Sequence, residues 1–227
     1  GWTVAEPRSS VSSGGASFRQ LEDNSLLLVG DSPDTDGYTV VLRTDKPSIK
    51  GIRLETLTDK ELTHNGPGRA HNGNFVLAEF SVFAAPADAP HKLTPVPIAS
   101  ATASFAQDGY PIELAFDGDF NTGWAIFDGG ATNKNCTAAF TLLEPVGYEK
   151  GTLFTIKLEH RYGKKHNIGR LRLSLTGNEP ANILYPDEVV AALLTEPSAR
   201  TSAQVDVLLH IYGQGDEAYK KLTEELE

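Results

Sequence analysis

The segment 115–124 carries the side chains of this chain best suited to binding a metal ion. It places two carboxylates, Asp117 and Asp119, beside an amide and the hydroxyl of Thr122, around a turn at Gly118. A loop of this composition offers the hard oxygen ligands that Ca²⁺ takes in sets of about six to eight. The segment therefore predicts a calcium-binding loop. An Asp-Gly turn followed by an Asx cap is the alternative interpretation.

A second segment, 77–82, carries one carboxylate in an otherwise apolar, alternating strand. That carboxylate is Glu79, and alternation points it inward. A buried carboxylate needs a partner, and a cation in a nearby loop would supply one. If the strand meets the loop 115–124, Glu79 would join the loop oxygens and main-chain carbonyls around a single ion.

Length and composition limit what the chain can be. Its 227 residues suit one large domain or two small ones, and 40% of them are hydrophobic, enough for a real core. The formal net charge of −10 argues against a nucleic-acid partner, because the phosphates would be repelled. No apolar run approaches the roughly 20 residues of a membrane-spanning helix, so membrane insertion is not expected.

The first residue and the single cysteine add two further expectations. The chain begins with Gly1 and contains no methionine, so we expect it to be a piece of a longer protein with neighbouring domains. Cys136 is the only cysteine, and its strand-like surroundings indicate a buried side chain rather than a reactive thiol.

Hydrophobic periodicity changes near residue 178. Before that point, period-two alternation between turn signals predicts many short strands and therefore an all-β sandwich over 1–178. The expected strands are 16–21, 25–29, 38–43, 49–56, 74–84, 98–105, 136–142, 153–160 and 168–176.

The remaining residues, 179–227, have helical spacing and are expected to form a short helical tail or a linker to a following domain. Three helices are expected, over 187–194, 199–213 and 217–227. Ser198 and Asp216 are the expected N-caps of the second and third helix.

Two motifs resemble those of a known family. The loop reads A-F-D-G-D-F-N-T-G-W over 115–124, and the strand reads L-A-E-F-S-V over 77–82. Both resemble motifs of the discoidin family, the coagulation-factor C-type, galactose-binding-like sandwiches that include many carbohydrate-binding modules. The resemblance implies a jelly-roll or discoidin-like fold with a structural calcium ion. By position, its ligands would be Asp117, Asp119, Thr122, Glu79 and the carbonyls of Leu114 and Ala78.

The order of these motifs departs from the family pattern. In the discoidin family the glutamate strand follows the loop, whereas here it precedes it. We therefore expect one sandwich with a circularly permuted strand order, in which 49–82 resembles the end of the domain and 98–176 its beginning. Permutation costs little when the termini lie close together. Two incomplete sandwiches packed together are the alternative.

A second resemblance covers nearly the whole β body. The sequence G-P-G-R-A-H-N-G-N-F-V-L-A-E-F over 66–80 follows I-R-L-E-T-L over 52–57. Together they are similar to a module of large planctomycete-type bacterial proteins that also carry cytochrome c-like domains. This resemblance implies an exported, extracellular or periplasmic protein that handles glycans. The chain itself has no C-x-x-C-H haem motif.

The glycine-rich loop 66–74 could contact a ligand beside the calcium loop. Its candidate ligand-binding residues are Arg69, His71, Asn72 and Asn74. Sugar hydroxyls need such polar groups together with an aromatic face. Trp124 or Phe127 could supply that face, with Tyr110 as an exposed alternative; Trp124 could equally belong to the core. The glycines could also serve the turn alone.

The segment 160–167 is a basic hairpin tip on an acidic protein. A solvated turn is the simplest interpretation. The alternative is a contact with a sulfated or uronic-acid glycan through Lys164 and Lys165, because cationic side chains pair with such anions. A zinc site formed by His160 and His166 is disfavoured, because no cysteine lies near them in sequence to complete it.

Catalytic motifs are missing from the sequence. It contains no G-x-S-x-G, H-E-x-x-H or P-loop motif. Asp117 and Asp119 could mimic a glycosidase pair, but Thr122 and Glu79 fit a metal site better. We therefore expect a non-catalytic carbohydrate-binding module with structural Ca²⁺ that binds an extracellular, neutral or anionic polysaccharide. The alternative is a structural or protein-interaction domain that spaces neighbouring domains of a larger exported protein.

Overall fold

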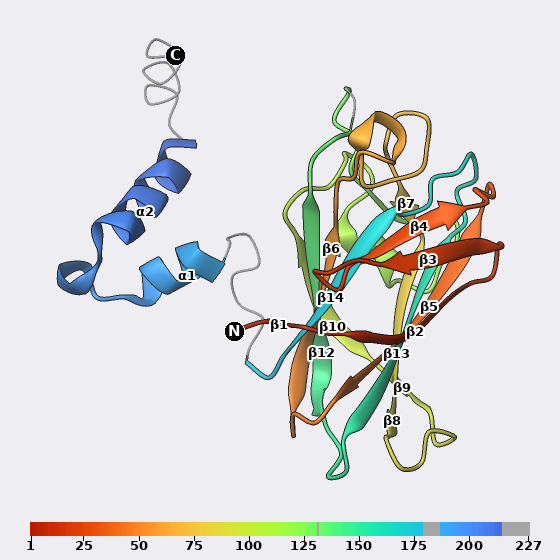
Figure 1. Ribbon diagram of the computed structural model, residues 1–227, viewed down its shortest axis with the longest axis horizontal. Helices are drawn as coiled ribbons and strands as arrows, with labels where there is room; N and C mark the ends of the chain where they lie inside the picture. Colours follow the sequence, from red (N-terminus) through yellow and green to blue (C-terminus); the bar gives the residue numbers. More distant parts are fainter. Residues whose placement is uncertain (131, 179–186, 215–227) are drawn as a thin grey trace. The chain divides into compact units, whose positions relative to one another are not determined.

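Antiparallel β-sheets are the main secondary structure of this chain. Its structure is a computed structural model that describes residues 1–130, 132–178 and 187–214. The seven-stranded sheet runs in the order β10 (Ile98–Ala103), β12 (Cys136–Val146), β6 (Ile49–Thr56), β14 (Arg170–Thr176), β4 (Leu26–Gly30) and β3 (Ala16–Gln20), with β1 (Thr3–Val4) beside β14. The five-stranded sheet runs in the order β2 (Pro7–Ser12), β5 (Asp36–Thr44), β13 (Thr152–His160), β8 (Glu79–Pro86) and β9 (Thr94–Val96). These sheets confirm the expected all-β sandwich (Figure 1).

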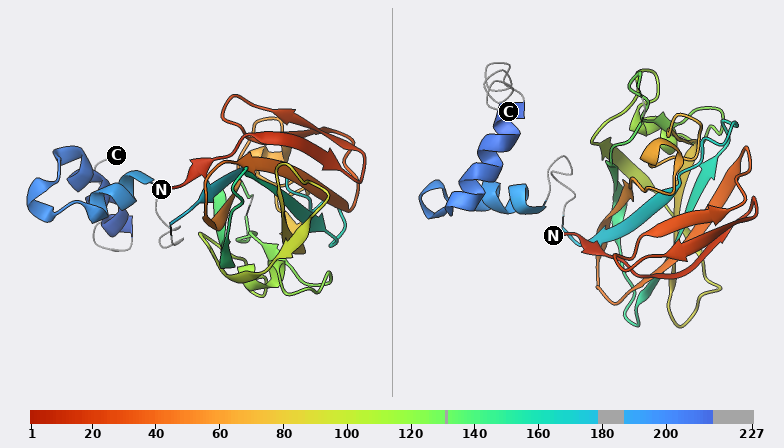
Figure 2. Two further views of the ribbon diagram at one scale, coloured as in Figure 1. Left: turned by 90° about the horizontal axis from the view of Figure 1, so that it is seen from below. Right: turned by 45° about the horizontal axis from the view of Figure 1, so that its top comes forward.

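The two sheets face each other, as the view from below shows (Figure 2), and a single hydrophobic core lies between them. Alternate residues of β13 are buried, from Thr152 to His160, because successive side chains of a strand point to opposite faces. Phe80 of β8 and Phe140 of β12 stack across the two sheets, with ring centroids 3.9 Å apart and planes within 5°. Cys136 is 1% exposed, which confirms the predicted burial, and burial raises the pKa of its thiol to about 11.

Strands from both halves of the sequence interleave in each sheet. In one sheet, β6 lies between β12 and β14; in the other, β13 lies between β5 and β8. The chain divides into two units, Gly1–Ile183 and Leu184–Glu227, so both halves of the β body lie in one unit. The strand that begins at Glu79 and the loop 115–124 therefore share a core.

The second unit contains α1 (Asp187–Leu194) and α2 (Ser202–Gln214), joined by a 3₁₀ turn at Pro197–Ala199. The prediction of α1 is confirmed, whereas the prediction of Ser198 as the N-cap of α2 was wrong. Thr201 and Gln204 cap that helix reciprocally, with N–H to side-chain distances of 3.3 and 3.0 Å, because they form a capping box. The predicted helix 217–227 and its cap Asp216 lie outside the described residues. Within the described parts of the chain, neither helix is long and apolar enough to cross a bilayer.

His160 is the buried end of the inward row of β13. It is 1% exposed, its Nδ1 lies 3.2 Å from the carbonyl oxygen of Asp36, and its ring packs on Tyr38 with centroids 4.6 Å apart. Burial lowers the pKa of His160 from its ordinary value of 6.5 to about 3. The side chain is therefore a neutral part of the core.

The buried His160 predicts an acid-sensitive fold. Its pKa is lower in the folded than in the unfolded chain, so its contribution to stability is lost as pH falls from about 6.5 towards 3. One proton can supply a slope of at most about 1.4 kcal/mol per pH unit. Urea unfolding between pH 7 and 4 should show a smaller pH slope in His160→Leu than in wild type. The exposed His91→Leu serves as the control, and equal slopes in all three proteins would contradict this assignment.

Candidate functional site

The loop 116–123 connects a 3₁₀ turn, η2 (Ile112–Ala115), to the short strand β11 (Trp124–Ala125), which pairs with β7 (Val76–Leu77). The loop turns at Gly118, whose φ of +81° is readily adopted only by glycine. The N–H of Gly118 donates to Oε2 of Glu79 over 3.1 Å. The structure thus brings Glu79, the first residue of β8, to the loop with which the sequence predicted a contact.

Several oxygen atoms of the loop converge on the hydroxyl of Thr122. Its Oγ1 lies 2.8 Å from Oδ2 of Asp117, 2.8 Å from the carbonyl oxygen of Asp119 and 3.4 Å from the carbonyl oxygen of Leu114. A hydroxyl carries one hydrogen and can donate it to only one of these acceptors at a time. The loop therefore concentrates oxygen lone pairs that its own donors cannot satisfy together.

Glu79 adds a second negative charge to this cluster. Burial raises the pKa of its carboxyl group, the hydrogen bond from Gly118 acts in the opposite direction, and the nearby charge of Asp117 raises the pKa further. Ser81 donates to the other carboxylate oxygen at the long distance of 3.5 Å. A half-buried Glu79 carboxylate whose pKa is raised by burial and by a neighbouring carboxylate is a favourable setting for a cation.

One of the predicted calcium ligands is already hydrogen-bonded within the loop. The carboxylate of Asp119 accepts hydrogen bonds from the backbone and side-chain nitrogens of Asn121, at 2.9 and 2.8 Å, and these bonds lower its pKa. Ala78 is buried and its N–H donates to the carbonyl of Glu159 over 2.8 Å, so its own carbonyl stays a predicted ligand. Nowhere in the described part of the chain do three His, Cys, Asp or Glu side chains lie in a metal-binding group.

The donors that do converge still fit a hard cation. They are the carboxylates of Glu79 and Asp117, the hydroxyl of Thr122 and the carbonyls of Leu114 and Asp119. All are oxygens, which is the ligand type of Ca²⁺. The geometry therefore favours the carbonyl of Asp119, rather than its carboxylate, as that residue's ligand atom.

Three of the predicted sugar-binding residues instead hold the fold together. Trp124 is 0% exposed, its Nε1 donates to the carbonyl of Phe105 over 3.0 Å, and its ring meets Phe75 edge to face. The prediction of Trp124 as a stacking face was therefore wrong, because its ring belongs to the core. Asn74 is 4% exposed and accepts the N–H of Ile126 over 3.1 Å. Asn72 accepts the N–H of Asn74 over 3.1 Å and shapes the turn.

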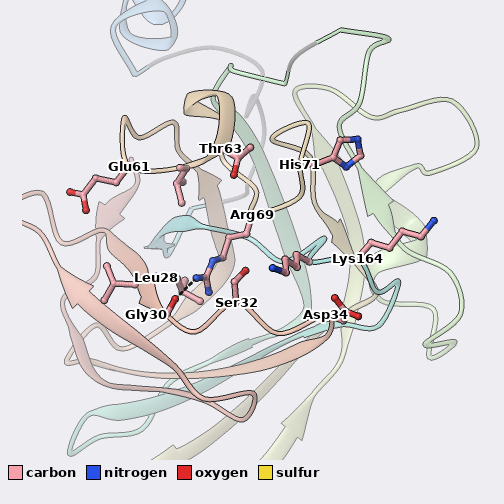
Figure 3. Close-up of a pocket in the computed structure, with 12 residues that line it drawn as sticks. Leu28, Gly30, Ser32, Asp34, Glu61, Thr63, Arg69, His71 and Lys164 are labelled. Carbon is pink, nitrogen blue, oxygen red and sulfur yellow. Dashed lines mark hydrogen bonds between the residues drawn. The ribbon is translucent and has the colours of Figure 1, made fainter.

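Arg69 and His71, by contrast, line an open cavity of about 790 Å³. Figure 3 shows Arg69 reaching across this cavity towards Gly30. Its Nη1 donates to the carbonyl of Asp31 over 2.7 Å and its Nη2 to the carbonyl of Gly30 over 3.0 Å. Phe127 is partly buried.

An aromatic pocket of about 370 Å³ lies beside the loop 116–123, which we term the carboxylate loop. It is lined by Val76, Tyr110, Phe120, Asn121, Thr122, Arg161 and Tyr162. Phe120 is 49% and Tyr162 53% exposed, and the rings of Tyr110 and Tyr162 meet edge to face with centroids 6.3 Å apart. Tyr162 also packs against His166, with ring centroids 4.8 Å apart.

Sequence reasoning identified Tyr110 only as an alternative and missed Phe120 and Tyr162. The available signal was that all three aromatic residues stand in polar, glycine-containing segments rather than in alternating strands. Their meeting could not be read from the sequence, because it depends on the loop 161–169 folding against the loop 116–123. The prediction of a hairpin tip at 160–167 was wrong, because β13 and β14 lie in different sheets and this loop crosses from one sheet to the other.

Comparisons with models of protein families, with curated proteins and with solved structures found no match to this chain. The resemblance to the discoidin family therefore stays a prediction, and the site must be interpreted from its own geometry.

The carboxylate loop predicts a stability that depends on calcium. Excess EDTA should lower the thermal unfolding midpoint of the wild type relative to millimolar Ca²⁺. The free energy of unfolding should be about 2.7 kcal/mol larger with calcium when the free ion is a hundred times Kd. Glu79→Gln keeps an acceptor for Gly118 but removes the charge, so it should abolish the calcium-dependent shift.

The same variant separates metal binding from folding. Since the pKa of Glu79 is raised on folding, the metal-free wild type should lose stability as pH rises through the titration range of Glu79, and Glu79→Gln should lose less. Differential scanning calorimetry at pH 4 to 7 in EDTA measures this. Identical midpoints with and without calcium in the wild type would contradict the calcium assignment.

Proposed function

We propose that this domain is a non-catalytic carbohydrate-binding module that binds a polysaccharide at the aromatic pocket, with a structural calcium ion ordering the adjacent loop. The observation that carries the proposal is the pairing of exposed rings with polar groups in one open pocket. Phe120 and Tyr162 offer apolar faces, while Arg161 and Asn121 offer hydrogen-bond donors.

The chemistry of this pocket suits a sugar. A sugar ring presents C–H groups on its faces and hydroxyl groups around its rim, so it needs aromatic surface and polar edge contacts together. The pocket is shallow enough to be reached by a chain rather than only by its end, since Phe120 and Tyr162 both remain about half exposed. We expect weak binding, because the ordering of a flexible polymer opposes the gain from a few contacts.

The proposed calcium ion would act on the pocket through the chain itself. Asn121 and Thr122 line the pocket, and Thr122 also contacts Asp117 in the oxygen cluster. Phe120 lies between Asp119 and Asn121 on the same loop. Neutralising Glu79 and Asp117 would hold this loop in one conformation and thereby fix the position of the Phe120 ring.

An extracellular or periplasmic setting agrees with this proposal. A site with two carboxylates in contact is expected to bind calcium weakly, in the range typical of extracellular modules. The support for export is the resemblance of 52–57 and 66–80 to modules of large exported proteins. Neighbouring domains of such a parent would supply any catalytic activity.

Affinity electrophoresis in gels that contain neutral polysaccharides tests the proposal. Phe120→Ala and Tyr162→Ala should each weaken retention by about three- to tenfold, the value of one aromatic contact. Leu143→Ala is the matched control, because Leu143 is a comparably exposed apolar side chain, 59% exposed, on β12.

The outcomes separate binding from a role as an interaction domain. Loss of retention in both ring variants, with Leu143→Ala unchanged, would support the module. If no polysaccharide retains the wild type in the presence of calcium, the glycan assignment fails and the domain is better interpreted as a spacer or protein-interaction domain.

A further inference from the structure

The larger cavity, which we term the basic cleft, is lined in part by the loop 161–169 that also carries Tyr162. It is lined by Leu28, Val29, Gly30, Ser32, Asp34, Glu61, Leu62, Thr63, Arg69, His71, Lys164 and Lys165. Figure 3 shows His71 and Lys164 together on one side of the cleft and Glu61 on the opposite side. The lysines therefore lie at one wall, which Asp34 shares with them.

The cations of the basic cleft are available to a ligand. None of the residues that the structure describes forms an ion pair with Lys164 or Lys165. Of the two acids in the lining, Glu61 is already paired with Arg19 outside the cleft, which leaves Asp34 as the opposing charge. The cleft thus keeps an excess of positive charge in a protein whose formal net charge is −10.

The backbone at the two lysines is a second, independent observation. Lys164 has a φ of 51° and Lys165 a φ of 62°, so two successive residues with long side chains adopt the left-handed conformation. Glycine or asparagine would fit such positions with less strain. Strained residues of this kind tend to occur where the side chain serves a binding site.

The walls of the cleft are fixed by hydrogen bonds between distant segments. The N–H of Lys165 donates to the carbonyl of Asp34 over 3.2 Å, and the N–H of Arg69 donates to the carbonyl of Asn167 over 2.9 Å. The guanidinium group of Arg69 spans to Gly30 and Asp31. The cations are therefore presented on a preformed frame.

The cleft and the aromatic pocket are joined through one short turn. Tyr162 lines the pocket, and Lys164 and Lys165 line the cleft. Three residues of chain span at most about 11 Å, so one polymer can contact both surfaces. His166 fixes the turn from inside, with Nδ1 2.9 Å from the carbonyl of Gly163 and its ring against Tyr162.

We propose that the basic cleft binds the sulfate or carboxylate groups of an anionic polysaccharide whose sugar rings occupy the aromatic pocket. The proposal rests on the glycan-binding function above and names its substrate class. Lys164 and Lys165 pair with the anionic groups, since ammonium groups form charge-assisted hydrogen bonds with such oxygens. The partner is a glycan rather than an acidic peptide because the adjacent pocket offers rings and polar edges together.

The test uses the full chain with calcium in affinity gels that contain dextran, dextran sulfate, alginate or polyglutamate. Lys164→Asn with Lys165→Asn removes two charges and suits the left-handed backbone, so the fold should be retained. The matched control is Lys92→Asn with Lys150→Asn. It removes the same charge from two exposed residues. Lys92 follows β8 and Lys150 precedes β13, so both lie at the end of β13 that is opposite the loop 161–169.

The double variant Lys164→Asn with Lys165→Asn should bind dextran sulfate or alginate about tenfold more weakly than wild type at low ionic strength. The control double variant should bind as wild type does. The difference should shrink as salt rises towards about 0.5 M. Dextran sulfate and alginate distinguish sulfate from carboxylate recognition, and retention of either one supports the proposal. Circular dichroism of each variant establishes that the fold is kept.

Three results would overturn the proposal. Equal binding by the Lys164/Lys165 double variant and the control, with Phe120→Ala still impaired, would mean that the glycan binds at the aromatic pocket without the cleft. Equal retention by polyglutamate through the same lysines would point to an acidic peptide partner. Failure of every polysaccharide, charged or neutral, would remove the proposed function itself.

Discussion

The contact between Glu79 and the backbone of Gly118 is the constraint on which the candidate site depends. One hydrogen bond of 3.1 Å joins the first residue of β8 to a loop 39 positions later and sets Glu79 near Asp117. Burial raises the pKa of Glu79, and the nearby charge of Asp117 raises it further, so the arrangement favours a proton or a cation at Glu79. A bound ion would satisfy this preference and would stiffen the loop that carries Phe120.

The β-sandwich makes this meeting possible because its sheets mix the two halves of the chain. The pairing of β8 with β13 and of β7 with β11 brings three segments to one end of the sandwich. These segments are the carboxylate loop, the glycine-rich loop 66–74 and the loop 161–169 after β13. The N–H of Val76, which follows the glycine-rich loop, donates to the carbonyl of His166 over 3.0 Å and so holds the loop 161–169 in place. The aromatic pocket and the basic cleft are therefore two faces of a single loop cluster.

Alternation carried most of the fold prediction, and it failed where side chains do not alternate in burial. The strands of the core were expected from their apolar rows, but β2 was missed, because P-R-S-S-V-S is a mostly exposed edge strand with little apolar signal. The loop motif led to the contact of Glu79 with Gly118. It could not tell that Asp119 would turn to Asn121, since that choice is made by local hydrogen bonds. For Trp124 the sequence left a stacking face and a place in the core equally open, because an aromatic residue in a polar loop does not reveal which way it points; the structure places it in the core. Phe120 and Tyr162 lie in separate segments, and only the tertiary fold brings them together.

The most direct test of the account is to locate the ion itself. Crystals grown in millimolar calcium should give one anomalous-difference peak at the carboxylate loop, with oxygens of Glu79, Asp117 and Thr122 at roughly 2.3–2.6 Å. The carbonyl of Asp119, rather than its carboxylate, should complete the set. A map with no peak at this loop, and with Glu79 hydrogen-bonded only to Gly118 and Ser81, would contradict the account.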